Sequence, residues 1–175
     1  MKKFSASALA TGVAGILAFG AGLLSASAET KMTDLNGEWR GTGNDRFLPI
    51  ESFQQTNCQN TIRADSRRIV CDMICNGKTG LRKVIRLTAS LDADQLEGSV
   101  SQKVSNSGDP SATEMNGTMS GQKIGDTASL SVRWTGLWPP TSVDLILHNS
   151  SSYSMHVTSL GLTMMNITFN RIAPH

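Results

Sequence analysis

The sequence has no excess of charge of one sign, since its 16 Lys and Arg residues nearly balance its 14 Asp and Glu residues. The formal net charge of +2 includes two lysines within the first three residues, so the rest of the chain is close to neutral. A nucleic-acid-binding domain carries a concentrated basic patch, and we therefore predict no nucleic-acid partner. We interpret basic pairs such as Arg67-Arg68 and Arg82-Lys83 as surface charges near hairpin ends.

Motifs of the common catalytic classes are also absent from the sequence. There is no Gly-x-Ser-x-Gly turn of a serine hydrolase. Gly41-Thr42-Gly43-Asn44 lacks the lysine and the strand–helix context of a phosphate-binding loop. His148 and His156 flank a hairpin and alternate with apolar residues, so we expect both to face solvent. We predict no catalytic residue, no metal site and no cofactor.

Long apolar runs are confined to the start of the chain, and no later segment is apolar enough to cross a bilayer as a helix. Met1-Lys2-Lys3 precedes an uncharged apolar stretch over residues 8–24, and Ala26-Ser27-Ala28 follows. This order defines a cleavable secretory signal peptide. We predict a signal-peptide helix over residues 1–28, removed from a single domain over residues 29–175. The mature protein is then exported, to the periplasm or the cell exterior, and is not an integral membrane protein.

The mature chain shows little helical periodicity and instead alternates apolar and polar residues, which is typical of strands with one buried face. In the last of these segments, Met165, Ile167 and Phe169 share one face, and polar residues occupy the other. Further inner-face sets are Leu35, Gly37, Trp39 and Gly41; Ile85, Leu87, Ala89 and Leu91; Leu96, Gly98, Val100 and Val104; Met115, Gly117, Met119 and Gly121; Leu130, Val132 and Trp134; Val143, Leu145 and Leu147; and Tyr153, Met155 and Val157.

Turn signals separate these short segments at regular spacing. They include Asn76-Gly77, Ser107-Gly108-Asp109-Pro110 and Pro139-Pro140. A meander of many strands leaves two unpaired edges unless it closes on itself. We therefore predict an all-β fold, a single antiparallel up-and-down β-barrel of about 8–10 strands. Glycines within the strands, such as Gly41 and Gly98, suit tight bends in such a barrel.

All three cysteines, Cys58, Cys71 and Cys75, lie after the signal peptide. In an oxidising compartment we expect one disulfide and one free thiol. A two-residue hairpin loop at Ala64-Asp65 pairs Cys58 with Cys71, whereas a four-residue loop over residues 65–68 pairs Cys58 with Cys75. Asp is favoured in a type I turn and Ala is unfavourable in a two-residue loop. We therefore favour Cys58–Cys75 and keep Cys58–Cys71 as the alternative.

Gly37-Glu38-Trp39 on the first expected strand resembles the opening Gly-x-Trp motif of the lipocalins and the wider calycin barrels. In that family an arginine near the end of the last strand packs on the Trp across the barrel floor, and Arg171 occupies that position here. The resemblance implies a lipocalin-like barrel in which Trp39 and Arg171 are structural. A cation–π contact with Trp39 would also satisfy an inward-facing Arg171. The bacterial metalloprotease inhibitors, small periplasmic barrels, have a comparable Gly-x-Trp start.

Apolar residues on the expected inner faces are the candidates for binding a ligand, since a barrel of this size can hold one small molecule. Trp138 follows the strand that ends near Trp134, where it lines the barrel mouth or a partner surface, or caps the core. The predicted ligand-binding residues are Leu87, Val100, Val132, Trp134, Trp138, Leu145 and Met155.

Three functions follow from this sequence, and they differ in what the barrel interior should contain. The first is a non-catalytic binding module for a small apolar ligand, or an interaction scaffold, and a hollow interior favours it. The second is a protein-binding inhibitor of an enzyme such as a protease, which acts through loops or residues 29–33; exposed apolar loops without an internal pocket favour it. The third is an enzyme, with His148 or His156 hydrogen-bonded to an acid in a cleft.

Overall fold

A computed structural model describes residues 32–107 and 109–172 of the 175-residue chain, so the predicted signal peptide lies outside the described residues. A short 3-10 helix, η1 (Met32–Leu35), precedes ten strands. The expected all-β fold is confirmed. The strands are β1 (Gly37–Asp45), β2 (Gln54–Ala64), β3 (Arg68–Gly77), β4 (Leu81–Asp92), β5 (Gln95–Asn106), β6 (Asp109–Ile124), β7 (Thr127–Trp134), β8 (Thr141–Asn149), β9 (Ser152–Ser159) and β10 (Leu162–Arg171).

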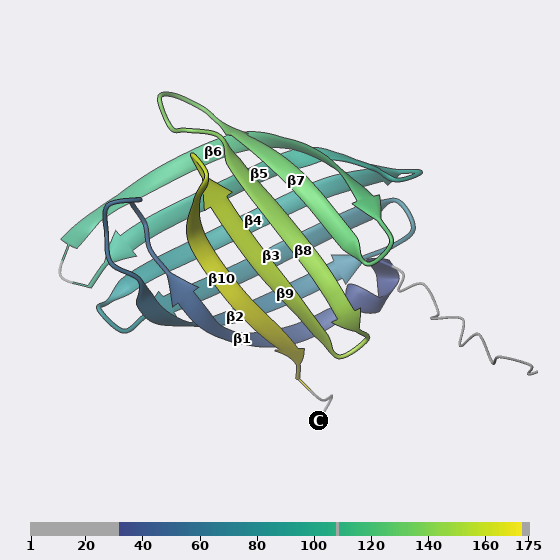
Figure 1. Ribbon diagram of the computed structural model, residues 1–175, viewed down its shortest axis with the longest axis horizontal. Helices are drawn as coiled ribbons and strands as arrows, with labels where there is room; N and C mark the ends of the chain where they lie inside the picture. Colours follow the sequence, from purple (N-terminus) through teal and green to yellow (C-terminus); the bar gives the residue numbers. More distant parts are fainter. Residues whose placement is uncertain (1–31, 108, 173–175) are drawn as a thin grey trace, which may run out of the picture.

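The strands form one closed antiparallel barrel in which each strand pairs with its neighbours in sequence and β1 pairs with β10 (Figure 1). Strands β8, β9 and β10 cross in front of β3, β4 and β5 in this view. Closure removes both free edges of the sheet. Among the described residues, no helix is long and apolar enough to cross a membrane.

The predicted inner faces are the faces that point into the barrel. In β10, Met165, Ile167 and Phe169 are buried, whereas the polar residues between them are exposed. The inner-face sets of the other strands are likewise buried or partly buried. Burial of one face in every strand fixes the register, because a slip of one residue would turn that face toward water.

Two glycines show why small residues recur inside these strands. A Cβ atom on Gly98 would lie 2.0 Å from the carbonyl oxygen of Thr88 on the neighbouring strand. A Cβ atom on Gly41 would lie 2.6 Å from Cδ1 of Phe169, which packs across it. Any larger residue at these positions would push apart backbone or core atoms that now touch.

The β2–β3 hairpin has the predicted four-residue turn. The Asp65 backbone N–H donates to the Arg68 carbonyl oxygen at 2.9 Å, and the Asp65 side chain accepts from the Arg68 N–H. This register places Cys58 directly opposite Cys75, and the two form a disulfide with a Cα–Cα distance of 4.0 Å. The favoured pairing is confirmed, and Cys71 is the free thiol.

The turn predicted over residues 107–110 is shorter than expected. Strand β6 already begins at Asp109, which pairs with Asn106 of β5. Pro110 therefore lies at the start of a strand and not in the turn. Proline is tolerated at this position because the ladder is irregular there, between Val104 and Asn106.

Candidate ligand-binding cavity

The barrel interior is hollow. It encloses a cavity of about 210 Å³ that is lined mainly by apolar side chains. The lining residues at the η1 end are buried, whereas Phe47, Trp138 and Met164 at the other end are partly exposed, so we call that end the open end. An apolar cavity of about 150 Å³ in another protein stays dry and binds benzene or xenon. The cavity is therefore large enough for a small apolar molecule.

All seven residues predicted to bind a ligand line this cavity. They come from different strands and from the β7–β8 loop, and alternation directs each strand residue inward. Trp138 lines the cavity at its open end, where its ring packs on Phe47 with the centroids 5.7 Å apart. The seven lining residues are Leu87, Val100, Val132, Trp134, Trp138, Leu145 and Met155.

The opposite end of the barrel is closed by η1 and the two structural residues of the Gly-x-Trp resemblance. The Arg171 guanidinium lies 4.4 Å from the centroid of the Trp39 ring. Arg171 also donates hydrogen bonds to the carbonyl oxygens of Asp34, which belongs to η1, and Asn36, which directly follows η1. Trp39 Nε1 donates to the Leu35 carbonyl oxygen at 2.9 Å, and the buried Leu35 side chain forms part of the cavity floor.

A polar triad lies on the cavity wall near this closed end. The Cys71 thiol donates to Asn60 Oδ1 at 3.0 Å, and Asn60 Nδ2 donates to the Tyr153 hydroxyl oxygen at 2.6 Å. All three side chains line the cavity. Burial raises the pKa of the Cys71 thiol to about 12 and raises that of Tyr153 well above its ordinary value. Both groups are therefore neutral hydrogen-bonding groups at physiological pH.

Tyr153 belongs to a compact aromatic cluster. Its ring stacks on Phe169 with the centroids 4.7 Å apart, and it meets the edge of Trp39 at 5.0 Å with the planes 76° apart. All three residues are at most 2% exposed. The cluster holds the Tyr153 hydroxyl in one place relative to the cavity.

A buried ion pair lies toward the open end. Lys83 Nζ is 2.5 Å from Asp45 Oδ1 and also donates to the Arg46 carbonyl oxygen at 2.9 Å. The prediction that Lys83 is a surface charge is wrong, because its side chain is only 5% exposed and lines the cavity. Burial raises the pKa of Asp45 and lowers that of Lys83, while their mutual attraction opposes both shifts.

The alternation of the strands contained a signal for each of these polar residues. Lys83 has the same parity as the inward Ile85 of β4, and Asp45 has the same parity as Trp39 of β1. Asn60 has the same parity as the buried Cys58 of β2. The neighbouring Arg82 favours a surface position for Lys83, and parity alone does not show which partner an inward Asp45 or Asn60 would have.

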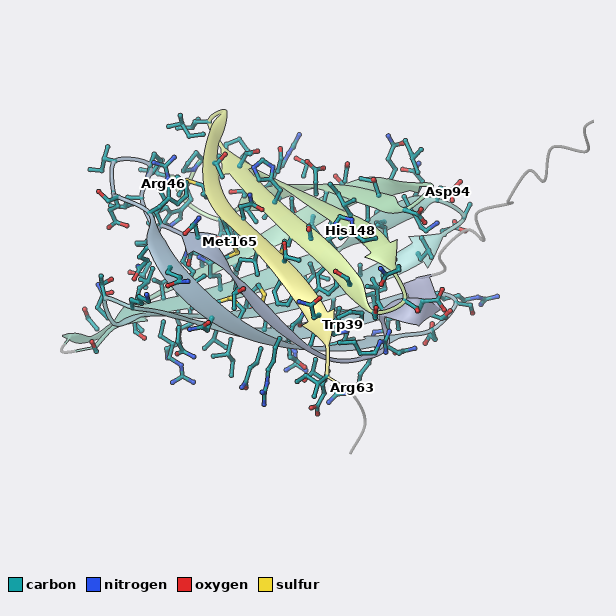
Figure 2. All side chains as sticks on the ribbon, turned by 60° about the horizontal axis from the view of Figure 1, so that its bottom comes forward. Trp39, Arg46, Arg63, Asp94, His148 and Met165 are labelled. Carbon is teal, nitrogen blue, oxygen red and sulfur yellow. A yellow bond between two sulfur atoms is a disulfide. The ribbon has the colours of Figure 1, made fainter. Side chains whose placement is uncertain are left out.

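The two ends of the barrel differ in their exposed residues. Figure 2 shows Arg46 at the open end and Asp94 at the other. At the closed end, the large exposed apolar residues in the described part of the chain are Ile124 and Ile146, which both pair with Thr127. The open end carries several, on the β1–β2 and β7–β8 loops and the β9–β10 turn: Ile50, Phe53, Leu137, Leu160 and Leu162.

The two histidines of the described barrel contact hydroxyl groups. His148 Nε2 lies 2.7 Å from Ser154 Oγ, and His156 Nε2 lies 3.3 Å from Thr163 Oγ1. His148 is exposed and His156 is partly exposed. Within residues 32–107 and 109–172, no three His, Cys, Asp or Glu side chains gather as a metal site would require. An enzymatic role for either histidine remains only a prediction.

Comparison with models of known protein families gives no match, and neither does comparison with curated protein sequences. The closed antiparallel barrel is compatible with a lipocalin-like fold. A fold of this kind hosts many functions, so function has to be inferred from the cavity itself.

Proposed function

We propose that this protein is an exported, non-catalytic barrel that binds one small apolar molecule inside its lumen. The cavity of about 210 Å³, with its largely apolar lining, is the observation that carries this proposal. Burial of apolar surface provides the binding free energy, at roughly 25 cal/mol for each Å² removed from water. The apolar rim at the open end supports the proposal, because it offers a compatible path of entry.

A pair of matched substitutions on β8 tests the proposal. Leu145 points into the cavity, whereas its neighbour Ile146 points outward and is 39% exposed. We expect N-phenyl-1-naphthylamine, a neutral fluorescent probe, to bind the wild-type protein and the Ile146→Trp variant. In Leu145→Trp the added ring fills the lumen, so probe binding should fall at least tenfold. Equal binding to both variants, or no binding to the wild type, would overturn the proposal.

Export is supported by two independent features. The first 28 residues have the composition of a signal peptide, and the Cys58–Cys75 disulfide suits an oxidising compartment. Expression of the full chain in a Gram-negative bacterium should yield a periplasmic protein that begins at Glu29. Mass spectrometry of the osmotic-shock fraction gives the mass of the mature protein and so identifies its first residue. An intact chain that stays in the cytoplasm would contradict export.

A protein-binding inhibitor is the second candidate: the exposed apolar loops support it, whereas the internal cavity favours the first candidate. Ile50 and Leu137 project fully into solvent on two loops of the same rim. Substitution of both by Ser should abolish inhibition of a target protease while probe binding in the lumen is retained. An effect of Leu145→Trp on inhibition would instead link the two activities.

A further inference from the structure

We infer that the closed end of the cavity binds a neutral hydrogen-bond-accepting oxygen of the ligand, a ketone, ester or hydroxyl oxygen, through the Tyr153 hydroxyl. This inference rests on the proposed ligand-binding function and adds the chemical class and the orientation of the ligand. The apolar body of the ligand then extends from Tyr153 toward the open end of the barrel.

A count of donors and acceptors in the triad carries the inference. Cys71, Asn60 and Tyr153 together present four protons on S–H, N–H and O–H groups. Two of these protons are already in hydrogen bonds: the Cys71 S–H donates to Asn60 Oδ1, and one Asn60 amide N–H donates to the Tyr153 hydroxyl oxygen. No described residue accepts the Tyr153 proton or the second Asn60 amide proton. A buried donor without an acceptor costs about 1–3 kcal/mol, so this end of the cavity favours a molecule that brings an acceptor.

The position of Tyr153 makes its hydroxyl a fixed donor. Its ring is held by Phe169 and Trp39, and its oxygen is held by Asn60. The residue is 2% exposed and lines the cavity, so the remaining partner must come from the lumen. A donor fixed in advance loses little conformational entropy on binding.

The charges of the cavity favour a neutral acceptor over a carboxylate at this end. The cations that line the cavity are Lys83 and Arg46, both toward the open end. Asn60 of the triad lies opposite Trp39 in the β1–β2 register. Asp45, which forms the ion pair with Lys83, lies six residues after Trp39 on β1. Six positions of a strand span about 20 Å, so no cation of the described lining neutralises an anion beside Tyr153.

Both lining cations are also already engaged. Lys83 is paired with Asp45, and Arg46 donates to the carbonyl oxygens of Thr163 and Pro49 at 2.8 Å. A carboxylate beside Tyr153 would lose its hydration without gaining an ion pair, which is costly. A ketone or hydroxyl oxygen carries no such penalty and needs only one donor.

Three small aromatic probes of similar shape test the inference: acetophenone, cumene and benzoate. Acetophenone carries a carbonyl oxygen where cumene carries a methyl group, and benzoate carries a negative charge. In Tyr153→Phe the ring and its stacking are retained and only the hydroxyl is lost. We expect this change to weaken acetophenone binding about tenfold, equivalent to 1.4 kcal/mol, and to change cumene binding less than twofold. Calorimetry or displacement of N-phenyl-1-naphthylamine gives the affinities.

Thr168→Val is the matched control, because it also removes one hydroxyl group but Thr168 is exposed on the outer face of β10. It should leave the ratio of acetophenone to cumene affinity unchanged. The infrared carbonyl stretch of bound acetophenone provides a measurement that needs no variant. Bound to the wild-type protein, the band should lie at lower wavenumber than in an apolar solvent, as expected for a carbonyl that accepts a hydrogen bond.

The outcomes separate this inference from the proposed function. Binding of both neutral probes with an unshifted carbonyl band, or with equal effects of Tyr153→Phe on both, would overturn the inference and leave the binding function intact. Tighter binding of benzoate than of acetophenone would also overturn it, since the site would then select an anion. Failure of both neutral probes to bind would count against the proposed function itself.

Discussion

Trp39 and Arg171 are direct partners across β1 and β10, and the Arg171 guanidinium lies 4.4 Å from the Trp39 ring centroid. The contact joins the first strand of the barrel to the last. It therefore stabilises the β1–β10 pairing, which closes the barrel and joins two strands that are not neighbours in the sequence. Arg171 also donates to the Ser150 carbonyl oxygen at 2.8 Å, which ties the β8–β9 turn to the same end.

Arg171→Ala should destabilise the barrel by about 2–4 kcal/mol, because it removes the cation–π contact and hydrogen bonds to three carbonyl oxygens. Urea unfolding followed by tryptophan fluorescence measures the change. Arg171→Lys should recover less than half of the loss, since an ammonium group cannot reach three acceptors in the plane of a guanidinium. The exposed Arg40 of β1 provides the control: Arg40→Ala should cost less than about 0.5 kcal/mol.

Removal of one partner of the buried ion pair should lower the stability of the barrel far more than replacement of both partners. Lys83→Met leaves Asp45 buried without its cation and should cost about 3–5 kcal/mol. The double variant Asp45→Leu with Lys83→Met should be close to wild type in urea unfolding, because an apolar pair replaces two desolvated charges. Lys103→Met is the matched control, since Lys103 forms an exposed pair with Glu114, and it should cost less than about 1 kcal/mol. A double variant as unstable as Lys83→Met would contradict this account.

The faces of the strands and the disulfide could be predicted because local rules determine them, whereas the Trp39–Arg171 contact is expected from the resemblance to the lipocalins. A period of two assigns each side chain to a face, and the turn at Asp65 sets the register that brings Cys58 to Cys75. The seven residues predicted to bind a ligand were chosen on the same rule, and all of them line the cavity.

The polar features of the lumen could not be predicted in the same way. Asn60 and Tyr153 meet across β1 and β10, so their contact depends on the register of three successive strand pairs. Lys83 lies at an inward position of β4, but its burial is tolerable only because Asp45 of β1 lies beside it. No local pattern shows that two charges 38 residues apart meet inside the barrel.

The Cys58–Cys75 disulfide should contribute about 3 kcal/mol to stability, the value expected for a cross-link that spans 17 residues. The Cys58→Ala/Cys75→Ala double variant should therefore unfold at a lower urea concentration. Both sulfur atoms are buried, so a mild reductant should attack the bond only slowly in the folded protein. Rapid reduction without unfolding, or an unchanged midpoint in the double variant, would contradict this prediction.

Cys71 should make the stability of the barrel depend on pH in the alkaline range. In the unfolded chain its thiol ionises near the ordinary pKa of 9.0, whereas burial raises the pKa in the folded protein to about 12. Below pH 9 both states hold the proton and the stability is unaffected. Between pH 9 and pH 12 only the folded state holds it, so stability falls as pH rises, by up to about 4 kcal/mol. Urea unfolding in brief incubations across this range measures the slope.

Cys71→Ala removes this titration and should flatten the alkaline slope, although Tyr153, whose pKa burial also raises, continues to contribute in the same direction. The ultraviolet absorbance of the thiolate reports the same proton directly. It should appear near pH 9 in the urea-unfolded protein and only near pH 12 in the folded one. A thiolate signal near pH 9 from the folded protein would show that water reaches Cys71 freely, which is incompatible with a dry apolar lumen. The one free thiol of the described barrel thereby reports whether the cavity excludes solvent.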